Sequence, residues 1–268
     1  MRPIVTAAAL LILVCAFVLG SVECRIDAGQ TRVVGSGRVV ELECSISGVT
    51  GVHLATFGDL KIEIGDDEKF VIEAEDNLID LIETGVERGI LQIGTRKHFS
   101  LKPQKKVRYF MTVKKLDTIV ISSSGDIFAP YIVTDEFDVT ISSSGDLVMK
   151  GIEAEAVSVR LSSSGDADID RIDTGELKVG ISSSGDLTID RGEAGYQNVQ
   201  ISSSGDYNAA DVRSEEARVS LSSSGDAHIY VDERLKVSLS SSGSVYYSGD
   251  ADATVTASSS GRLKRIGR

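Results

Sequence analysis

The chain has no Trp, and Phe, Trp and Tyr together make up only 5% of its 268 residues. A sequence with so few rings suits a narrow core with little room for large aromatic side chains. There are also only three Cys residues, too few for the disulfide framework that stabilises many small exported domains. We therefore expect the folded chain to be stabilised by packing.

Long hydrophobic segments are missing everywhere except at the N-terminus. There, Arg2 precedes an apolar run over 7–20 that is too short for a membrane span and is typical of a secretory signal. We predict a signal peptide over 1–24, and hence an exported protein with no transmembrane span in its mature part. Three cleavage points fit the sequence equally, after Gly20, Ser21 or Cys24.

Loss of the signal would remove Cys15 and leave Cys44 alone, unless early cleavage keeps Cys24 as its partner. Lipidation of Cys24 is a weaker alternative, because Glu23 stands where such sites usually need a small residue. Cys44 has no His at a spacing typical of a catalytic pair, so we expect a buried thiol.

Positive charge is also scarce: 28 Lys and Arg residues against 40 Asp and Glu residues give a formal net charge of −12. General nucleic-acid binding needs a basic footprint on the protein surface. The charge balance therefore argues against a nucleic-acid partner.

One tract, Ser-Ser-Ser-Gly-Asp, is abundant instead. It recurs six times at a spacing of 20 residues, and two degraded copies follow at a spacing of 18. The glycines of the eight copies are Gly125, Gly145, Gly165, Gly185, Gly205, Gly225, Gly243 and Gly261. Self-similarity at a fixed period predicts structural units that stack on their neighbours.

Apolar and polar residues alternate on both sides of each tract. In one copy Val179 and Ile181 precede the tract, Leu187 and Ile189 follow it, and the other copies keep these columns largely apolar. This period of two predicts a strand, a bend, a second strand and then a variable return, over 170–176 in one copy. We predict an all-β fold: a right-handed parallel β-helix (β-solenoid) with coils of about 20 residues.

One such coil would not fold alone. Four buried apolar side chains contribute roughly 6–12 kcal/mol, whereas ordering the backbone and side chains of one coil costs about 30 kcal/mol. Stacking adds hydrogen bonds between coils and a continuous core. Only the array is therefore expected to be stable.

The bend itself has two possible structures. If the alternation continues through it, the middle Ser and the Gly point inward, and the Gly marks a narrow place in the coil. The Gly could instead adopt a positive φ that turns the chain. Stacked serines could also pass hydrogen bonds from coil to coil.

The aspartates of the tract would form a column along the stack: Asp126, Asp146, Asp166, Asp186, Asp206 and Asp226. Neighbouring carboxylates ~4.8 Å apart repel by ~1 kcal/mol even in water. Backbone N–H donors at the bend, solvation or a bound cation such as Ca²⁺ could offset this repulsion. We favour capping of the turn by the carboxylates, and a cation-binding column is the weaker alternative.

Other candidate site residues form no pattern. The histidines share no column of the repeat: His53, His98 and His228. No Gly-x-Ser-x-Gly motif supports serine catalysis, so no catalytic residue and no cofactor is predicted. Basic residues near the end of the chain would most simply block edge-to-edge pairing of the last coil, with contact to an anionic surface as the alternative: Arg262, Lys264, Arg265 and Arg268.

The first third of the chain lacks the strict repeat. Four segments have strand patterns, 38–46, 59–64, 70–74 and 90–93, and a short helix is expected over 76–83, ended by Gly85. We predict irregular β coils over 25–115 that cap the stack and regular β-helix repeats over 116–268, together one continuous domain.

Several motifs in this order carry a family resemblance. They are Val-Val-Gly-Ser-Gly from Val33, the segment 70–78, Gly-Ile-Leu-Gln-Ile from Gly89, Leu-Asp-Thr-Ile from Leu116 and the serial Ser-Gly-Asp coils. Over 33–261 the chain resembles the auto-transporter adhesin head GIN domain family of bacterial exported proteins. The resemblance implies an exported or envelope-associated protein without assigned catalytic residues. Ser-Ser-Ser-Gly-Asp stands here where Gly-Ser-Gly-Asp is commoner in the family.

We therefore expect an exported, non-enzymatic β-helix in the periplasm, at the cell surface or outside the cell. It would serve as an adhesin-like structural or binding module, with a polysaccharide or an envelope protein as partner. One alternative is a polysaccharide-active β-helix enzyme, for which Tyr207, Tyr230, Tyr246 and Tyr247 are the aromatic cluster to test. Acidic residues that recur in every coil argue against a single active site. The other alternative is a calcium-stabilised extracellular rod.

Overall fold

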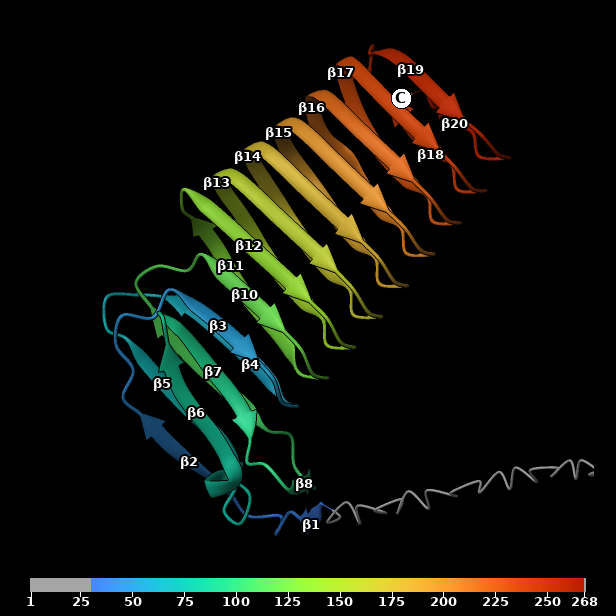
Figure 1. Ribbon diagram of the computed structural model, residues 1–268. Helices are drawn as coiled ribbons and strands as arrows, with labels where there is room; N and C mark the ends of the chain where they lie inside the picture. Colours follow the sequence, from blue (N-terminus) through green and yellow to red (C-terminus); the bar gives the residue numbers. More distant parts are fainter. Residues whose placement is uncertain (1–29, 268) are drawn as a thin grey trace, which may run out of the picture.

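The computed structural model describes residues 30–267, so the predicted signal peptide over 1–24 lies outside the described residues (Figure 1). That part of the chain forms β-strands and one short 3₁₀ turn, η1 (Ile79–Leu81), and contains no α-helix. The strands are β1 (Thr31–Val34), β2 (Val39–Cys44), β3 (Gly51–Leu54), β4 (Asp59–Ile64), β5 (Lys69–Glu75), β6 (Ile82–Glu87), β7 (Ile90–Thr95), β8 (Phe99–Lys102), β9 (Arg108–Val113), β10 (Thr118–Ile121), β11 (Asp126–Val133), β12 (Glu136–Ile141), β13 (Leu147–Leu161), β14 (Ala167–Ile181), β15 (Leu187–Ile201), β16 (Tyr207–Leu221), β17 (Ala227–Leu239), β18 (Val245–Ser248), β19 (Asp252–Ala257) and β20 (Leu263–Arg265).

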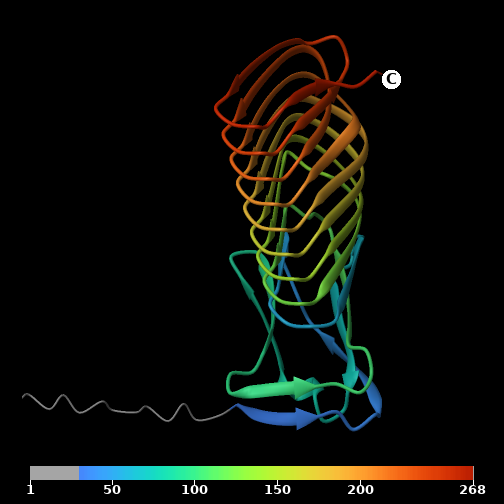
Figure 2. The same cartoon turned by 90° about the vertical axis from the view of Figure 1, so that its right-hand side faces the viewer.

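The strands wind into a β-solenoid of about seven turns, which confirms the predicted fold class (Figures 1 and 2). Neighbouring coils pair in parallel with an offset of 20 residues: Val159 lies beside Val179, and Val179 beside Val199. In the last coils the offset falls to 18, so that Val237 lies beside Val255. The sequence period is thus the hydrogen-bonding register of the stack.

The predicted apolar columns form the core. Val179, Ile181, Leu187 and Ile189 are all buried, and so are most of their counterparts in the coils above and below. Side chains at the positions between them point outward, as the alternation of a strand requires. The dry interior is therefore built from the same few columns throughout the stack.

The return predicted over 170–176 is not a separate element. Strand β14 runs through it, with Ile172 and Leu177 buried and Ile172 paired to Ile152 of β13. The backbone here lies against neighbouring coils on both sides, so its N–H and C=O groups join the same ladders. The sequence suggested a variable return here because most residues of this segment are polar and point outward.

The bends confirm one of the two structures considered for the glycines. Gly145, Gly165 and Gly185 are buried, and none of them has a positive φ. A Cβ placed on Gly185 would stand 2.2 Å from the carbonyl oxygen of Gly165. Close approach of successive backbones, and not the left-handed region, therefore requires glycine here. The middle serines are only half-buried.

Hydrogen bonds between bends are made mainly by the backbone. The N–H of Gly165 donates to the carbonyl of Ser143 at 2.9 Å, and the next coils repeat this bond. The first serine hydroxyl of several bends also reaches a carbonyl of the coil below, as Ser162 does to Ile141 at 3.4 Å. The serines thus bond to neighbouring backbone and do not form a hydroxyl-to-hydroxyl ladder.

The regular stack begins before the exact repeats. Strands β3 and β4 lie in register beneath β10 and β11. Their connection, residues 54–59, has the sequence Leu-Ala-Thr-Phe-Gly-Asp and occupies the place of a Ser-Ser-Ser-Gly-Asp bend. Val52, Leu54, Leu60 and Ile62 fill the four core columns of this coil. It is a diverged copy of the repeat.

Below this coil the N-terminal strands close the stack. Strands β7 and β9 continue it in parallel, while β6, β5 and β2 add antiparallel pairs. In Figure 2, β1 (blue) and β8 (green) lie side by side at its base. The short helix predicted over 76–83 is wrong: only η1 is helical, and β6 follows directly. The alternating residues Ile82, Thr84 and Val86 pair with β7, so tertiary pairing overrides the local helical preference.

Glu75 connects separate segments of this base by hydrogen bonds. Its carboxylate is fully buried and accepts backbone N–H bonds from Gly37 (2.5 Å), Gln104 (2.8 Å) and Lys105 (3.4 Å). Burial alone would raise the pKa of Glu75, but these three donors and the Lys105 charge outweigh it and hold the pKa below its ordinary value. The ionised carboxylate therefore joins the segment after β1 to the loop before β9.

Candidate functional site

The six predicted aspartates all lie at the same position of the bend, and each accepts a hydrogen bond from the next coil. The N···Oδ1 distances are 3.0 Å from Asp146 to Asp126, 2.9 Å from Asp166 to Asp146, 2.8 Å from Asp186 to Asp166, 2.7 Å from Asp206 to Asp186, 2.7 Å from Asp226 to Asp206 and 2.7 Å from Ser244 to Asp226. Backbone N–H donors were one of the three factors considered that could offset the repulsion between neighbouring carboxylates. The structure places such a donor against each Asp of the column.

Several carboxylates lie close to Asp168 on the outward side of β14. Burial raises the pKa of Asp168, and the nearby charges of Asp166, Asp190 and Asp146 raise it further. Asp170, in contrast, is paired with Arg191 at 3.0 Å. Within residues 30–267, no three His, Cys, Asp or Glu side chains are grouped so as to hold a metal ion.

The histidines are scattered, as their positions in the sequence indicated. His53 is hydrogen-bonded to Gln92 (2.7 Å) and Ser122 (2.6 Å), whereas His98 lies in a turn with φ of 70°. The ring of His228 stacks on Tyr246, with centroids 4.6 Å apart. Cys44 is half-buried, and not the buried thiol expected from the sequence. The structure brings none of these groups into a common site.

The tyrosines singled out as an aromatic cluster do not form one surface. Tyr207 is fully buried in the core, and its hydroxyl donates to the side chain of Gln197 at 2.8 Å. Tyr230 and Tyr247 are each only 9% exposed, and Arg213 lies over the Tyr230 ring. Tyr246 alone is half-exposed, against His228. The cluster thus provides no extended platform for sugar rings.

A long open groove runs instead over the strand halves that precede the bends. It consists of two adjoining cavities of about 390 and 470 Å³, which share Gln200 and Ser202. We call it the hydroxyl groove. Its outward side chains are Thr140, Ser158, Arg160, Ser162, Lys178, Ser182, Asn198, Gln200, Ser202, Ser220, Ser222, Ser238, Ser240, Thr256 and Ser258.

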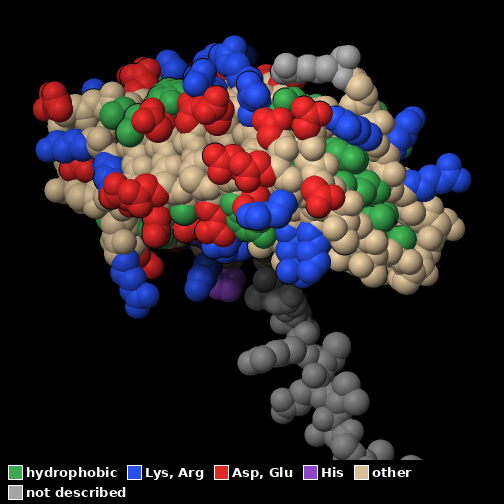
Figure 3. Space-filling model, turned by 90° about the horizontal axis from the view of Figure 1, so that it is seen from above, with side chains coloured by type: hydrophobic (Ala, Val, Ile, Leu, Met, Phe, Trp, Pro, Cys, Tyr) green, Lys and Arg blue, Asp and Glu red, His purple; other side chains and the backbone are tan. Residues whose placement is uncertain are grey.

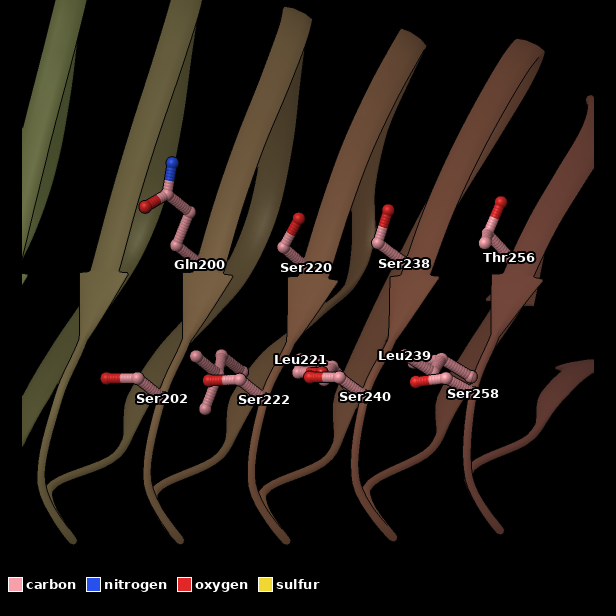
Figure 4. Close-up of a pocket in the computed structure, with 11 residues that line it drawn as sticks. Gln200, Ser202, Ser220, Leu221, Ser222, Ser238, Leu239, Ser240, Thr256 and Ser258 are labelled. Carbon is pink, nitrogen blue, oxygen red and sulfur yellow. The ribbon is translucent and has the colours of Figure 1, made fainter.

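Figure 4 shows the part of this groove nearest the C-terminus. Ser202, Ser222, Ser240 and Ser258 form one row of hydroxyl groups there, and the side chains from Gln200 to Thr256 form a second row parallel to it. The rows arise because outward positions repeat once per coil. No Asp or Glu lines either cavity of the groove. The surface is therefore rich in neutral donors and acceptors.

A third cavity, of about 420 Å³, lies beside the groove on the same strands. It is lined by Tyr196, Glu216, Ala217, Arg218, Arg234, Leu235, Lys236, Asp252 and Thr254. Arg218 and Lys236 each stand two residues before a groove serine, Ser220 and Ser238, on the same strands. The charged cavity is thus adjacent to the uncharged C-terminal part of the groove.

Another part of the outer surface is apolar. Phe110, Phe128 and Val148 are 38%, 41% and 42% exposed, on β9, β11 and β13. They lie in one row along the stack, with Lys61 of β4 between the two phenylalanines. On the side seen in Figure 3, hydrophobic patches lie among interspersed acidic and basic side chains.

The sequence patterns did not predict the groove, although the residues that line it recur at fixed positions of the repeat. Serine or threonine fills the position five residues before the repeat glycine in several coils, and serine fills the position three residues before it in all eight. The sequence predicted that these residues point outward. That two such rows border a hollow follows only from the path of the backbone into the bend.

Comparison with known proteins identifies the family. A sequence model of the family described as "Putative auto-transporter adhesin, head GIN domain" matches residues 48–170 and 157–251, which is most of the chain. The chain belongs to this family. This confirms the resemblance found in its motifs.

Solved structures show the same fold as this head GIN domain protein. A "putative adhesin" from Parabacteroides merdae has a TM-score of 0.81 at 19% identity, over 88% of this chain and 99% of the other. A "putative lipid binding protein" from Parabacteroides distasonis has a TM-score of 0.82 at 21% identity, over 88% and 100%. At these identities the likeness concerns the fold alone.

A search of curated proteins finds no match to the head GIN domain chain. Among the described residues, no helix is long and apolar enough to cross a membrane.

Proposed function

We propose that this head GIN domain protein is an exported, non-enzymatic, adhesin-like module that binds an extended polysaccharide along the hydroxyl groove. The observation that carries the proposal is the groove itself, open along several coils and lined by hydroxyl, amide and a few basic side chains. Family membership and the adhesin names of similar structures agree with a binding role.

The repeat of the groove fits a chain-like ligand. Equivalent side chains recur every ~4.8 Å along the stack, comparable to the length of one sugar residue in an extended chain. Each coil offers weak hydrogen bonds that compete with water. Many coils bound by one polymer add up through effective concentration, so long chains should bind far more tightly than short ones.

The test is binding of the mature protein to a panel of soluble polysaccharides and to short oligosaccharides of the same sugars. Replacing Ser220 and Ser238 by Leu would fill the groove and is expected to weaken binding about tenfold or more. Thr188→Leu with Asn208→Leu is the matched control, since both residues point outward on adjacent coils away from the groove. Equal effects of the two double variants, or no binding to any polysaccharide, would contradict the proposal.

A polysaccharide-active enzyme is the rival within the same ligand class. Glycoside hydrolysis commonly uses a pair of carboxylates across the scissile bond, and the lining of the hydroxyl groove contains none. Release of shortened products from any polysaccharide of the panel would overturn the non-enzymatic assignment. The binding assay and this product assay can use the same samples.

The apolar row of Phe110, Phe128 and Val148 favours a second candidate function, contact with envelope lipid. Co-sedimentation with phosphatidylcholine vesicles tests it. Phe128→Ser with Val148→Ser should reduce vesicle binding, whereas Val133→Ser, 65% exposed but outside the row, should not. Absence of vesicle binding by the unaltered protein would exclude this function.

A further inference from the structure

Two cations beside the hydroxyl groove lack the partners that their neighbours have. On the same outward surface Arg160 is paired with Asp138 (3.5 Å), Lys178 with Glu176 (3.1 Å), and Arg234 with Glu216. Arg218 and Lys236, both exposed, form no ion pair or side-chain hydrogen bond with any residue between 30 and 267.

These two residues are also direct neighbours. Arg218 of β16 is the register partner of Lys236 of β17. Two positive charges on adjacent strands, ~4.8 Å apart at the backbone, repel each other by ~1 kcal/mol at full exposure to water. No ion pair with a described residue offsets this repulsion.

Arg218 and Lys236 both line the third cavity, which has room for a ligand. It is lined by three cations, Arg218, Arg234 and Lys236, against two carboxylates, Glu216 and Asp252, of which Glu216 is already paired with Arg234. The half-exposed ring of Tyr196 lies at the same cavity and offers an apolar face. The cavity therefore has an excess of positive charge next to the uncharged C-terminal part of the groove.

From this arrangement we infer that Arg218 and Lys236 form an anion site for an acidic sugar, so that the groove prefers an anionic polysaccharide. The inference rests on the proposed function. A chain lying over Ser220 and Ser238 would carry its carboxylate or sulfate groups past both cations. Arginine and lysine form their stronger hydrogen bonds with such charged acceptors, and the serine rows of the groove would hold the hydroxyl groups of the same chain.

The experiment compares three probes: polygalacturonate for carboxylate, dextran sulfate for sulfate, and unmodified dextran as a neutral chain. The double variant Arg218→Gln, Lys236→Gln should bind at least one anionic probe about tenfold more weakly, and dextran as before. The matched control is Lys150→Gln with Lys264→Gln, which removes the same charge from two exposed residues that form no ion pair in the described structure. It should leave the affinity for anionic probes nearly unchanged.

The outcomes separate the inference from the proposed function. Equal losses in the two double variants would assign the effect to net charge and overturn the anion site. Binding of dextran as tight as that of the anionic probes, unaffected by the Gln substitutions, would overturn the anion site and leave the groove intact. Failure of every polysaccharide to bind would overturn both. Unchanged melting temperatures of both variants would show that the fold is not the cause.

Discussion

Gly185 and Gly180 differ only in what surrounds them. A Cβ on Gly185 would meet the backbone of the coil below at 2.2 Å, whereas nothing lies within 4 Å of a Cβ on Gly180. Neither residue has a positive φ, so the comparison isolates the space available to a methyl group. Because the close neighbour of Gly185 is a carbonyl oxygen of the main chain, it cannot turn aside as a side chain would.

We predict that Gly185→Ala lowers the free energy of unfolding by about 3 kcal/mol or more, because two coils must move apart at the bend. Gly180→Ala should change it by less than about 1 kcal/mol. Urea unfolding of both variants measures the difference. Similar stabilities would show that the bends are more loosely packed than the structure has them.

Glu75 offers a second test at the level of one residue. Its folded-state pKa lies below the ordinary value of 4.5, so its contribution to stability is complete above that pH and is lost as the pH falls through the folded pKa. Glu75→Gln should cost about 2–3 kcal/mol at pH 7, because the amide cannot accept three N–H bonds as a carboxylate does. The difference from the unaltered protein should shrink in acid.

Unfolding followed at pH 7 and at several lower pH values checks this dependence. Glu41→Gln, at an exposed position on β2 with no ion pair among the described residues, is the control. A pH-independent difference between Glu75→Gln and the unaltered protein would contradict the assigned role of the ionised carboxylate.

Strands β15, β16 and β17 are joined by a polar network inside the core. Tyr207 donates to Gln197, the amide of Gln197 lies 3.2 Å from the hydroxyl of Ser214, and Ser214 donates to the carbonyl of Tyr230 at 2.6 Å. Burial raises the pKa of Tyr207, so its hydroxyl keeps its proton and remains a donor. An apolar core alone would not require Gln197 to face Tyr207.

Tyr207→Phe should lower the free energy of unfolding by about 1–3 kcal/mol, because the buried carbonyl of Gln197 loses its donor. Adding Gln197→Leu to this variant should restore part of that stability, since both polar partners are then absent. Thermal unfolding of the single and double variants measures the coupling. A double variant no more stable than Tyr207→Phe alone would contradict this role.

The secondary structure elements also show where sequence patterns succeed and where they fail. Strands were predicted correctly where apolar residues alternate, as at 59–64 and 90–93. The helix predicted over 76–83 failed, because β6 obtains its hydrogen bonds from β7, a partner that a local pattern does not reveal. The diverged coil of β3 and β4 was missed because Ala-Thr-Phe replaces the three serines before Gly58.

At the scale of the whole molecule, one coil is a removable unit. Deleting 166–185 would join Gly165 to Asp186 and place β15 on β13 with every column in register. We predict that this variant folds and retains a β-sheet circular dichroism spectrum. A deletion of half a coil, 166–175, should abolish cooperative unfolding, because it would place the bend over 182–185 beside strand residues 152–155 of β13 and interrupt the ladder there. Folding of both, or of neither, would contradict the coil as the structural unit.

The aspartate column gives a prediction for the entire stack. Each of its six carboxylates already accepts a backbone N–H from the next coil. We therefore expect millimolar Ca²⁺ to leave the melting temperature unchanged, and a chelator to have no effect. A clear rise with Ca²⁺, reversed by the chelator, would support the calcium-stabilised rod instead.

The sequence by itself determined the period, the inward columns and the parallel stack, because each repeat carries the same alternation and only stacked coils can bury it. The neighbours of each residue in the adjacent coils, however, are 18 to 20 positions away in the sequence. The register and the path of the bends decide which outward side chains pair across that distance. The tertiary structure thus decided that Arg234 finds Glu216 while Arg218 and Lys236 do not, and that two rows of hydroxyl groups border a groove.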